Sequence, residues 1–148
     1  MKHALHLFFV YCGVWFQLLA AMSALEKFTL EFHIETTPKL LYTLIGTPDG
    51  LTRWFARTTF RAPDIFLFHW EGKEQPARLF QSKENEYVIF QWLEDYHKDY
   101  FLEMRIERGV NTSGVTLFIS DYSDAVDVDV SKRLWQLQVG HLQRLFNA

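Results

Sequence analysis

The sequence predicts a single α+β domain, in which an antiparallel sheet packs against one long C-terminal helix and two short helices follow the first strand. Three observations predict this class. Most of residues 25–120 alternate between apolar and polar side chains, the period of half-buried strands. The polar separators between these segments are short, as they are in antiparallel hairpins. Residues 130–146 then change to helical spacing.

Length and composition are consistent with one folded domain that lacks a strongly basic surface. The chain has 148 residues, with 15 Lys and Arg against 18 Asp and Glu, and a formal net charge of −3. This balance disfavours nucleic-acid binding through phosphate neutralisation, which needs a clustered basic surface. Aromatic residues make up 17% of the chain, enough to build a large core or to line a cavity. The single cysteine, Cys12, excludes an internal disulfide and a zinc cluster built from cysteines.

Residues 1–21 form an apolar leader, for which three interpretations stay open. The run from Ala4 to Ala21 contains no Asp, Glu, Lys or Arg. It is upstream sequence before a true start at Met22, a secretory signal, or a short membrane anchor. The first interpretation leaves residues 22–148 as the domain and predicts a cytoplasmic protein. If residues 1–23 are instead a signal peptide, the protein is exported, and membrane attachment is expected only if the leader is retained.

The domain begins with a strand and two short helices. Apolar residues occupy every second position of residues 28–34, which predicts a half-buried strand. Thr37 is a suitable N-cap and is followed by proline at the first helical position, so a helix is expected over residues 38–45. The segment 46–50 then ends this helix and begins another turn or two.

Six further strands are predicted after the second short helix. Glycine, proline and polar residues separate them at hairpin-like intervals. The segment 76–81 is assigned to an edge of the sheet, because Pro76 has no amide hydrogen to donate to a neighbouring strand. The predicted strands cover residues 58–61, 65–71, 76–81, 88–92, 100–107 and 115–119.

The C-terminal segment predicts a long amphipathic helix that packs across the sheet. One narrow arc of this helix is mainly apolar, and Leu137 lies near its centre. Four aspartates near the start of the helix, at positions 121, 124, 127 and 129, complement the positive end of its dipole. The arc contains Val130, Leu134, Leu137, His141 and Leu145, and is widened by Trp135, Leu142 and Phe146.

Short motifs accompany this order of elements, and they are Thr37-Pro38, Thr47-Pro48-Asp49-Gly50-Leu51, Trp54-Phe55, Phe66-x-Phe68-x-Trp70-x-Gly72, Phe90-x-Trp92, and the closing helix with Trp135 and Leu142. With this order and these motifs, the chain resembles the START-like superfamily, also called helix-grip or SRPBCC. That superfamily includes the activators of the heat-shock chaperone ATPase, and the likeness is greatest to small START-like proteins common in Bacteroidetes. The resemblance covers residues 26–146 and implies a curved sheet around the terminal helix, with a cavity for an apolar ligand between them.

The function expected from this resemblance is non-catalytic binding of a small hydrophobic ligand between the sheet and the C-terminal helix. Apolar walls with a few polar groups suit such a ligand, although the same aromatic side chains would also suit a filled core. The alternative function is a protein-interaction module, as the chaperone-activator relatives imply. For that role Phe101 and Phe118 are candidates, since both are expected on the outer face of the sheet, where a partner or second copy would bind. The candidate ligand-binding residues are Trp54, Phe66, Phe68, Trp70, Phe90, Trp92, Met104, Leu137 and His141.

Signatures of catalysis and metal binding are absent from the sequence. The histidines show neither His-x-x-x-His nor His-Glu-x-x-His spacing, and there is no Gly-x-Ser-x-Gly elbow or phosphate-binding glycine loop. The aspartates at 121–129 lack the glycine and the distal glutamate of an EF-hand. We therefore predict no enzymatic activity, no bound metal and no cofactor.

Overall fold

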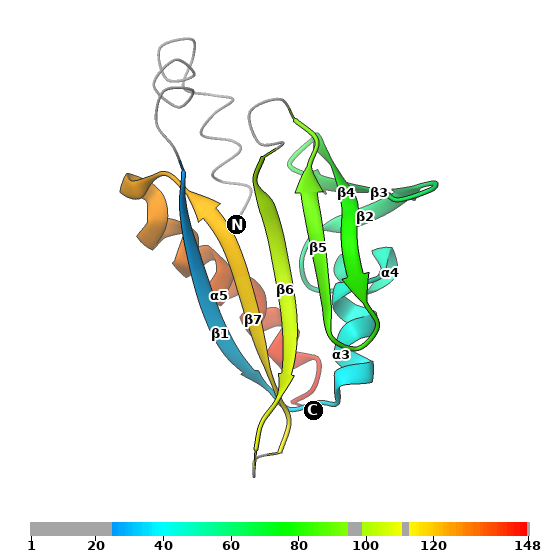
Figure 1. Ribbon diagram of the computed structural model, residues 1–148, viewed down its shortest axis with the longest axis vertical. Coiled ribbons are helices and arrows are strands. Elements are labelled where there is room, and N and C mark those ends of the chain that lie inside the picture. Colours follow the sequence, from blue (N-terminus) through cyan, green and yellow to red (C-terminus); the bar gives the residue numbers. More distant parts are fainter. Residues whose placement is uncertain (1–24, 95–98, 111–112, 148) are drawn as a thin grey trace.

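The computed structural model describes residues 25–94, 99–110 and 113–147, so the leader and its three interpretations lie outside the described residues. Within these ranges the strands form one seven-stranded antiparallel sheet in the order β1-β7-β6-β5-β4-β3-β2 (Figure 1). The predicted α+β class with a START-like arrangement of elements is confirmed. The strands are β1 (Glu26–Ile34), β2 (Arg57–Arg61), β3 (Ile65–Trp70), β4 (Lys73–Lys83), β5 (Tyr87–Trp92), β6 (Phe101–Arg108) and β7 (Val115–Ser123).

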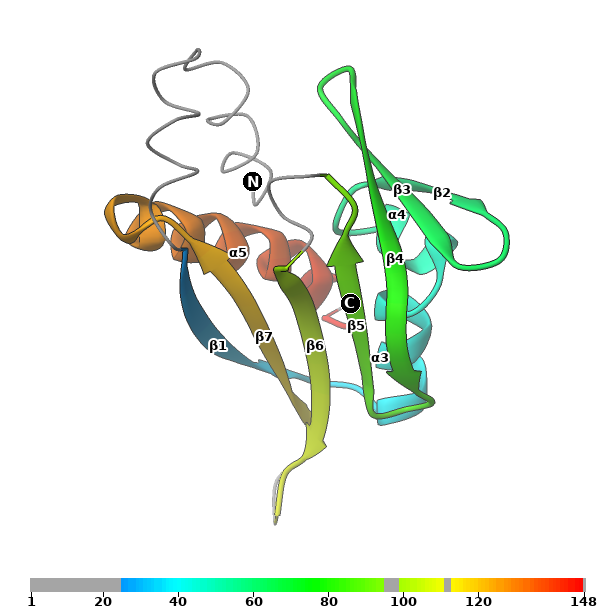
Figure 2. The ribbon, with the colours of Figure 1, turned by 45° about the horizontal axis from the view of Figure 1, so that its top comes forward.

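Helices cover one face of this curved sheet (Figure 2). The terminal helix α5 (Val128–Arg144) contacts β1 and β7, and it is preceded by the 3₁₀ turn η1 (Ala125–Asp127). The short helices α3 (Pro38–Ile45) and α4 (Pro48–Thr52) contact each other, and they contact β6 and β2 respectively. The core therefore lies between the inner face of the sheet and these three helices.

Local capping explains why the two short helices begin where the sequence predicts. The side-chain oxygens of Thr37 and Thr47 accept hydrogen bonds from the amides of Leu40 and Gly50, at 3.3 and 3.0 Å. Each cap is followed by a proline at the start of its helix. Gly50 also allows the close approach of the two helices, because an added Cβ would lie 2.0 Å from the carbonyl oxygen of Thr43.

The prediction that residues 76–81 form an edge strand was wrong. β4 lies between β3 and β5, and the edges of the described sheet are β1 and β2. Pro76 is tolerated because it lies opposite the end of β5. Its carbonyl accepts a hydrogen bond from the amide of Leu93, and Leu93 is one residue beyond the last residue of β5. At that position no ladder bond from the proline nitrogen is needed.

The predicted buried face of α5 was also wrong. Val130, Leu137 and Leu145 are exposed, and the helix is rotated by roughly 100° from the expected orientation, given about 100° per residue. The helix carries two apolar arcs, and the one containing Trp135 packs on the sheet. The sequence analysis placed Trp135 and Leu142 at one side of the predicted face, whereas in the structure they belong to the buried arc, together with a serine and a glutamine. Its buried residues are Ser131, Trp135, Gln138, Val139 and Leu142.

Candidate functional site

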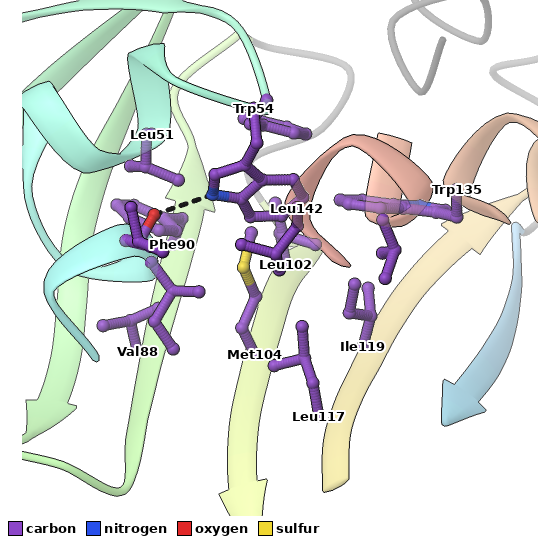
Figure 3. Close-up of a cluster of buried hydrophobic side chains, with 14 of the residues drawn as sticks. Leu51, Trp54, Val88, Phe90, Leu102, Met104, Leu117, Ile119, Trp135 and Leu142 are labelled. Carbon is purple, nitrogen blue, oxygen red and sulfur yellow. Dashed lines mark hydrogen bonds between the residues drawn. The ribbon is translucent and has the colours of Figure 1, made fainter. Parts of the chain in front are cut away.

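Seven of the nine predicted ligand-binding residues lie together between the sheet and the helices. All seven are buried, and they come from the segment after α4 and from the inner faces of β3, β5 and β6. Figure 3 shows that Trp54, Phe90 and Met104 lie in one cluster of buried side chains together with Leu142 of α5. The seven are Trp54, Phe66, Phe68, Trp70, Phe90, Trp92 and Met104.

The rings of this cluster pack directly on one another. Phe68 lies at its centre, with centroid distances of 5.6 Å to Trp70, 5.7 Å to Phe90 and 5.7 Å to Trp92. Phe66 extends the cluster through an edge contact with Phe90 at 5.1 Å. These separations are typical of aromatic pairs in a packed core. Phe68 and Phe90 have no solvent-exposed surface, so both side chains contact only other protein atoms.

Leu137 and His141 do not belong to this cluster, and the prediction that they line it was wrong. Leu137 is 65% exposed, and His141 is also exposed. The Nδ1 atom of His141 accepts a hydrogen bond from the guanidinium of Arg144, one turn later on α5, at 2.6 Å. Both side chains lie on the side of α5 that faces away from the core.

Phe55 and Trp135 join the terminal helix to the aromatic cluster, although neither was among the predicted site residues. Their rings stack at 5.4 Å with an interplanar angle of 9°. Phe55 also makes edge contacts with Phe68 and Trp70, at 5.4 and 5.5 Å. The buried phase of α5 was the missing signal, since Trp135, Val139 and Leu142 follow the i, i+4, i+7 spacing of a core-facing helix.

Three polar groups on the buried side are held by specific hydrogen bonds. The side-chain amide of Gln138 donates to the carbonyls of Trp54 and Phe55, at 2.9 and 2.6 Å. The indole nitrogen of Trp54 donates to the carbonyl of Leu44 at 2.8 Å, the dashed line in Figure 3. The indole of Trp135 donates to Oδ2 of Asp121 at 2.9 Å. These bonds fix the orientation of α5 and of the segment after α4, because breaking any of them leaves a buried group unpaired.

Asp121 belongs to this buried set. The sequence had instead grouped it with three other aspartates near the start of the terminal helix. It lies in β7, is 4% exposed, and accepts a second hydrogen bond from the amide of Tyr122 at 2.9 Å. The neighbouring hydroxyls of Ser131 and Ser123 are 3.1 Å apart. The alternation of β7 predicts this position, since Asp121 continues the inward phase of Val115, Leu117 and Ile119.

Gln75 is the one polar side chain on the inner face of β4 that leaves a buried atom unsatisfied. It is 3% exposed, and it pairs across the sheet with Phe68. Among the described residues, no group donates a hydrogen bond to its Oε1. Buried amide oxygens nearly always have a donor, so this atom is free to accept one from an additional group.

The outer face of the sheet carries a second group of aromatic residues. Phe101 and Phe118 are half-buried there, as predicted, while their neighbours Leu102, Leu117 and Ile119 point inward. A register shift between Leu79 and Gln81 in β4 accompanies the exposure of Phe80. The ring of Phe80 meets that of Phe101 at 5.0 Å.

Charged groups near the outer face make local pairs. The guanidinium of Arg105 lies 4.7 Å from the Tyr87 ring centroid and 2.7 Å from the carboxylate of Glu103. A surface pocket of about 460 Å³ lies at the β3–β4 hairpin, where cationic and acidic residues alternate. It is lined by Arg57, His69, Glu71, Gly72, Lys73 and Glu74.

The perturbed carboxyl groups are at the surface and do not form a catalytic pair. Burial, together with the charge of Asp124, raises the pKa of Asp127 at the start of α5. Hydrogen bonds from His33 and Ser113 lower the pKa of Glu35. In the part of the chain that the structure describes, no cluster of three or more His, Cys, Asp or Glu residues is placed to hold a metal, and no helix is long and apolar enough to cross a membrane.

A family model for the START-like superfamily domain matches residues 22–148, which is most of the sequence. The chain belongs to the START-like superfamily. This membership agrees with the strand order and the terminal helix described above. No curated protein matches the chain significantly.

Several solved structures superpose on this domain. BfR322 from Bacteroides fragilis is 29% identical, with a TM-score of 0.60, and the match covers 83% of this chain and 92% of that one. The Aha1 dimer from Colwellia psychrerythraea is 13% identical, with a TM-score of 0.69, and the match covers 82% of this chain and 96% of that one. DynU16, a protein of the dynemicin biosynthetic locus, is 14% identical with a TM-score of 0.71, and the match covers 82% of this chain and 47% of DynU16. The likeness to Aha1 and DynU16 is a likeness of fold.

Proposed function

We propose that this START-like domain is a non-catalytic protein-interaction module that binds through apolar side chains on its outside. One observation carries the proposal. The residues expected to line a ligand cavity pack on one another, while apolar side chains of α5 and of the outer sheet face point to solvent. Exposed apolar groups that are aligned along one element are typical of interaction sites.

Two surfaces are candidates for the interaction. The first is the exposed side of α5, centred on Leu137, and the second is the outer sheet face around Phe80 and Phe101. A chaperone ATPase is the partner that the family resemblance implies, and a second copy of the chain is the alternative. A cytoplasmic location suits either partner and is part of the proposal.

Surface variants test this function. Leu137→Glu and Phe80→Glu each place a charge in one of the two surfaces, and both positions are more than half exposed, so the fold should survive. We expect one variant to lose the complexes that the unaltered chain forms, as measured by cross-linking in cells followed by native mass spectrometry. If both variants keep every complex, the module function is contradicted.

Binding of a small apolar ligand is the second candidate, favoured by Gln75. An apolar wall that contains one amide oxygen without a donor is the arrangement by which a pocket orients a ligand that carries a hydroxyl or N–H group. Such a ligand would have to displace the packed rings around Phe68. Native mass spectrometry of the full chain would detect a co-purified compound. Titration with fatty acids, isoprenoids and aromatic metabolites, followed by tryptophan fluorescence, should show saturable binding that Gln75→Leu weakens if this second function is correct.

A further inference from the structure

The exposed side of α5 carries a stripe with the spacing of a helix-pairing seam. We define the α5 stripe as Val130, Leu134, Leu137, His141 and Leu145. Val130 is 45% exposed, Leu137 65% and Leu145 37%, and Leu134 is half-buried. The steps from 130 to 134, 137 and 141 alternate between four and three residues, which is the a/d repeat of a coiled coil. The core of the domain uses only the opposite face of α5, which carries Trp135, Val139 and Leu142 and is buried against the sheet. The stripe is therefore not needed for the core.

We propose that the α5 stripe binds the same stripe of a second copy of the chain, with the two helices antiparallel. This inference rests on the proposed interaction function and names its partner and its surface. A two-fold axis near Leu137 brings the two Leu137 side chains together. It also places Val130 of one copy opposite Leu145 of the partner subunit, because both lie seven or eight positions from the centre. The stripe is therefore complementary to itself, as a two-fold dimer requires.

Charge selects the antiparallel arrangement and favours a second copy as the occupant. The first turn of α5 contains Asp129, the second contains Lys132 and Arg133, and the last contains Arg144. In an antiparallel pair Asp129 of each helix lies near Arg144 of the other, twice per dimer, while Lys132 and Arg133 lie opposite residues 141 and 142 and not opposite their own copies. A parallel pair would place like charges together and align the two helix dipoles. The pairing of unlike ends thus adds to the apolar contact at the centre.

Sedimentation equilibrium of the full chain over a range of concentrations tests the inference. We expect a monomer–dimer equilibrium whose dissociation constant rises about tenfold or more in Leu137→Glu, since two like charges then meet at the axis. Leu40→Glu is the matched control, because Leu40 is a leucine of α3 with 54% exposure that is not part of the stripe. This control should dimerise like the unaltered chain.

Charge exchange tests the orientation of the two helices. Asp129→Arg and Arg144→Asp should each weaken the dimer, and the double variant should restore it, because acidic and basic ends again meet. If the double variant dimerises no better than the two single variants, the antiparallel pairing is contradicted.

The remaining outcomes separate the two claims. A full chain that stays monomeric at all concentrations overturns the inference. The stripe would then have another occupant, either residues 1–24 of the same chain or a different protein. If Leu137→Glu still abolishes complexes with other proteins in that case, the proposed function stands. If Phe80→Glu disrupts the dimer and Leu137→Glu does not, the dimer uses the outer sheet face and the inference is likewise overturned.

Discussion

Two leucines of α5 provide a matched test of which face of the helix holds the domain together. Leu142 has no solvent-exposed surface and packs in the core, whereas Leu137 is 65% exposed on the opposite side. Both lie in the same helix, and alanine is at least as good a helix former as leucine. A difference between the two alanine variants therefore reports packing and not helix propensity.

The size of the difference follows from burial. Leu142→Ala should lower the free energy of unfolding by about 2–5 kcal/mol, the range for a fully buried leucine, because the transfer energy is lost and a cavity remains. Leu137→Ala should change it by less than about 0.5 kcal/mol, as expected for an exposed side chain. The sequence alone had placed Leu137 near the centre of the buried face.

Urea denaturation followed by circular dichroism measures both values. The protein is kept dilute, so that the dimer proposed above does not contribute to the stability of the unaltered chain. A loss of more than 2 kcal/mol in Leu137→Ala, with little loss in Leu142→Ala, would show that α5 packs with its other face on the sheet, contrary to the structure.

Three further predictions concern α5, the residue before it and the leader. Trp135→Phe removes the donor to the buried Oδ2 of Asp121, and should cost about 1–3 kcal/mol in urea denaturation; an unchanged midpoint would mean that this bond is not formed. The pKa of Asp127 is raised in the folded state, so its contribution to stability is present below pH 3.8 and is lost as the pH rises through the raised value. Asp127→Asn should therefore gain stability relative to the unaltered chain between pH 3 and pH 7, and a constant difference across this range would contradict the shift. A chain that begins at Met22 should match the full chain in circular dichroism and thermal midpoint, and a large drop would assign residues 1–21 a part in the fold.

Local signals in the sequence were sufficient to predict most elements of the fold. The helix over residues 38–45 was predicted with the bounds that the structure shows, because a threonine cap and a following proline act within one turn. Strand alternation likewise predicted which residues of β3, β5, β6 and β7 point inward. The edge assignment of Pro76 failed because it depended on where a neighbouring strand ends, and the residue itself does not encode that.

The face of α5 depended on contacts between residues far apart in the sequence. Ser131 and Gln138 are polar and yet buried, and the side chain of Gln138 bonds to two carbonyls 83 and 84 residues earlier in the chain. Once those partners are known, burying this face satisfies its polar atoms, and the more continuous apolar stripe is left outside. The alternation of the strands was enough to predict that the aromatic residues face inward, but it could not distinguish a filled core from a cavity between them.

The central claim is that the interior of this domain is a packed core and that the α5 stripe is its interaction surface. The most direct test is a methyl NMR spectrum of the full chain, recorded at increasing protein concentration. Methyl signals of Val130, Leu134, Leu137 and Leu145 should shift with concentration, while those of the buried Val88, Leu102 and Met104 should stay constant. Fixed stripe signals, together with interior signals that shift when a fatty acid or an isoprenoid is added, would contradict the account.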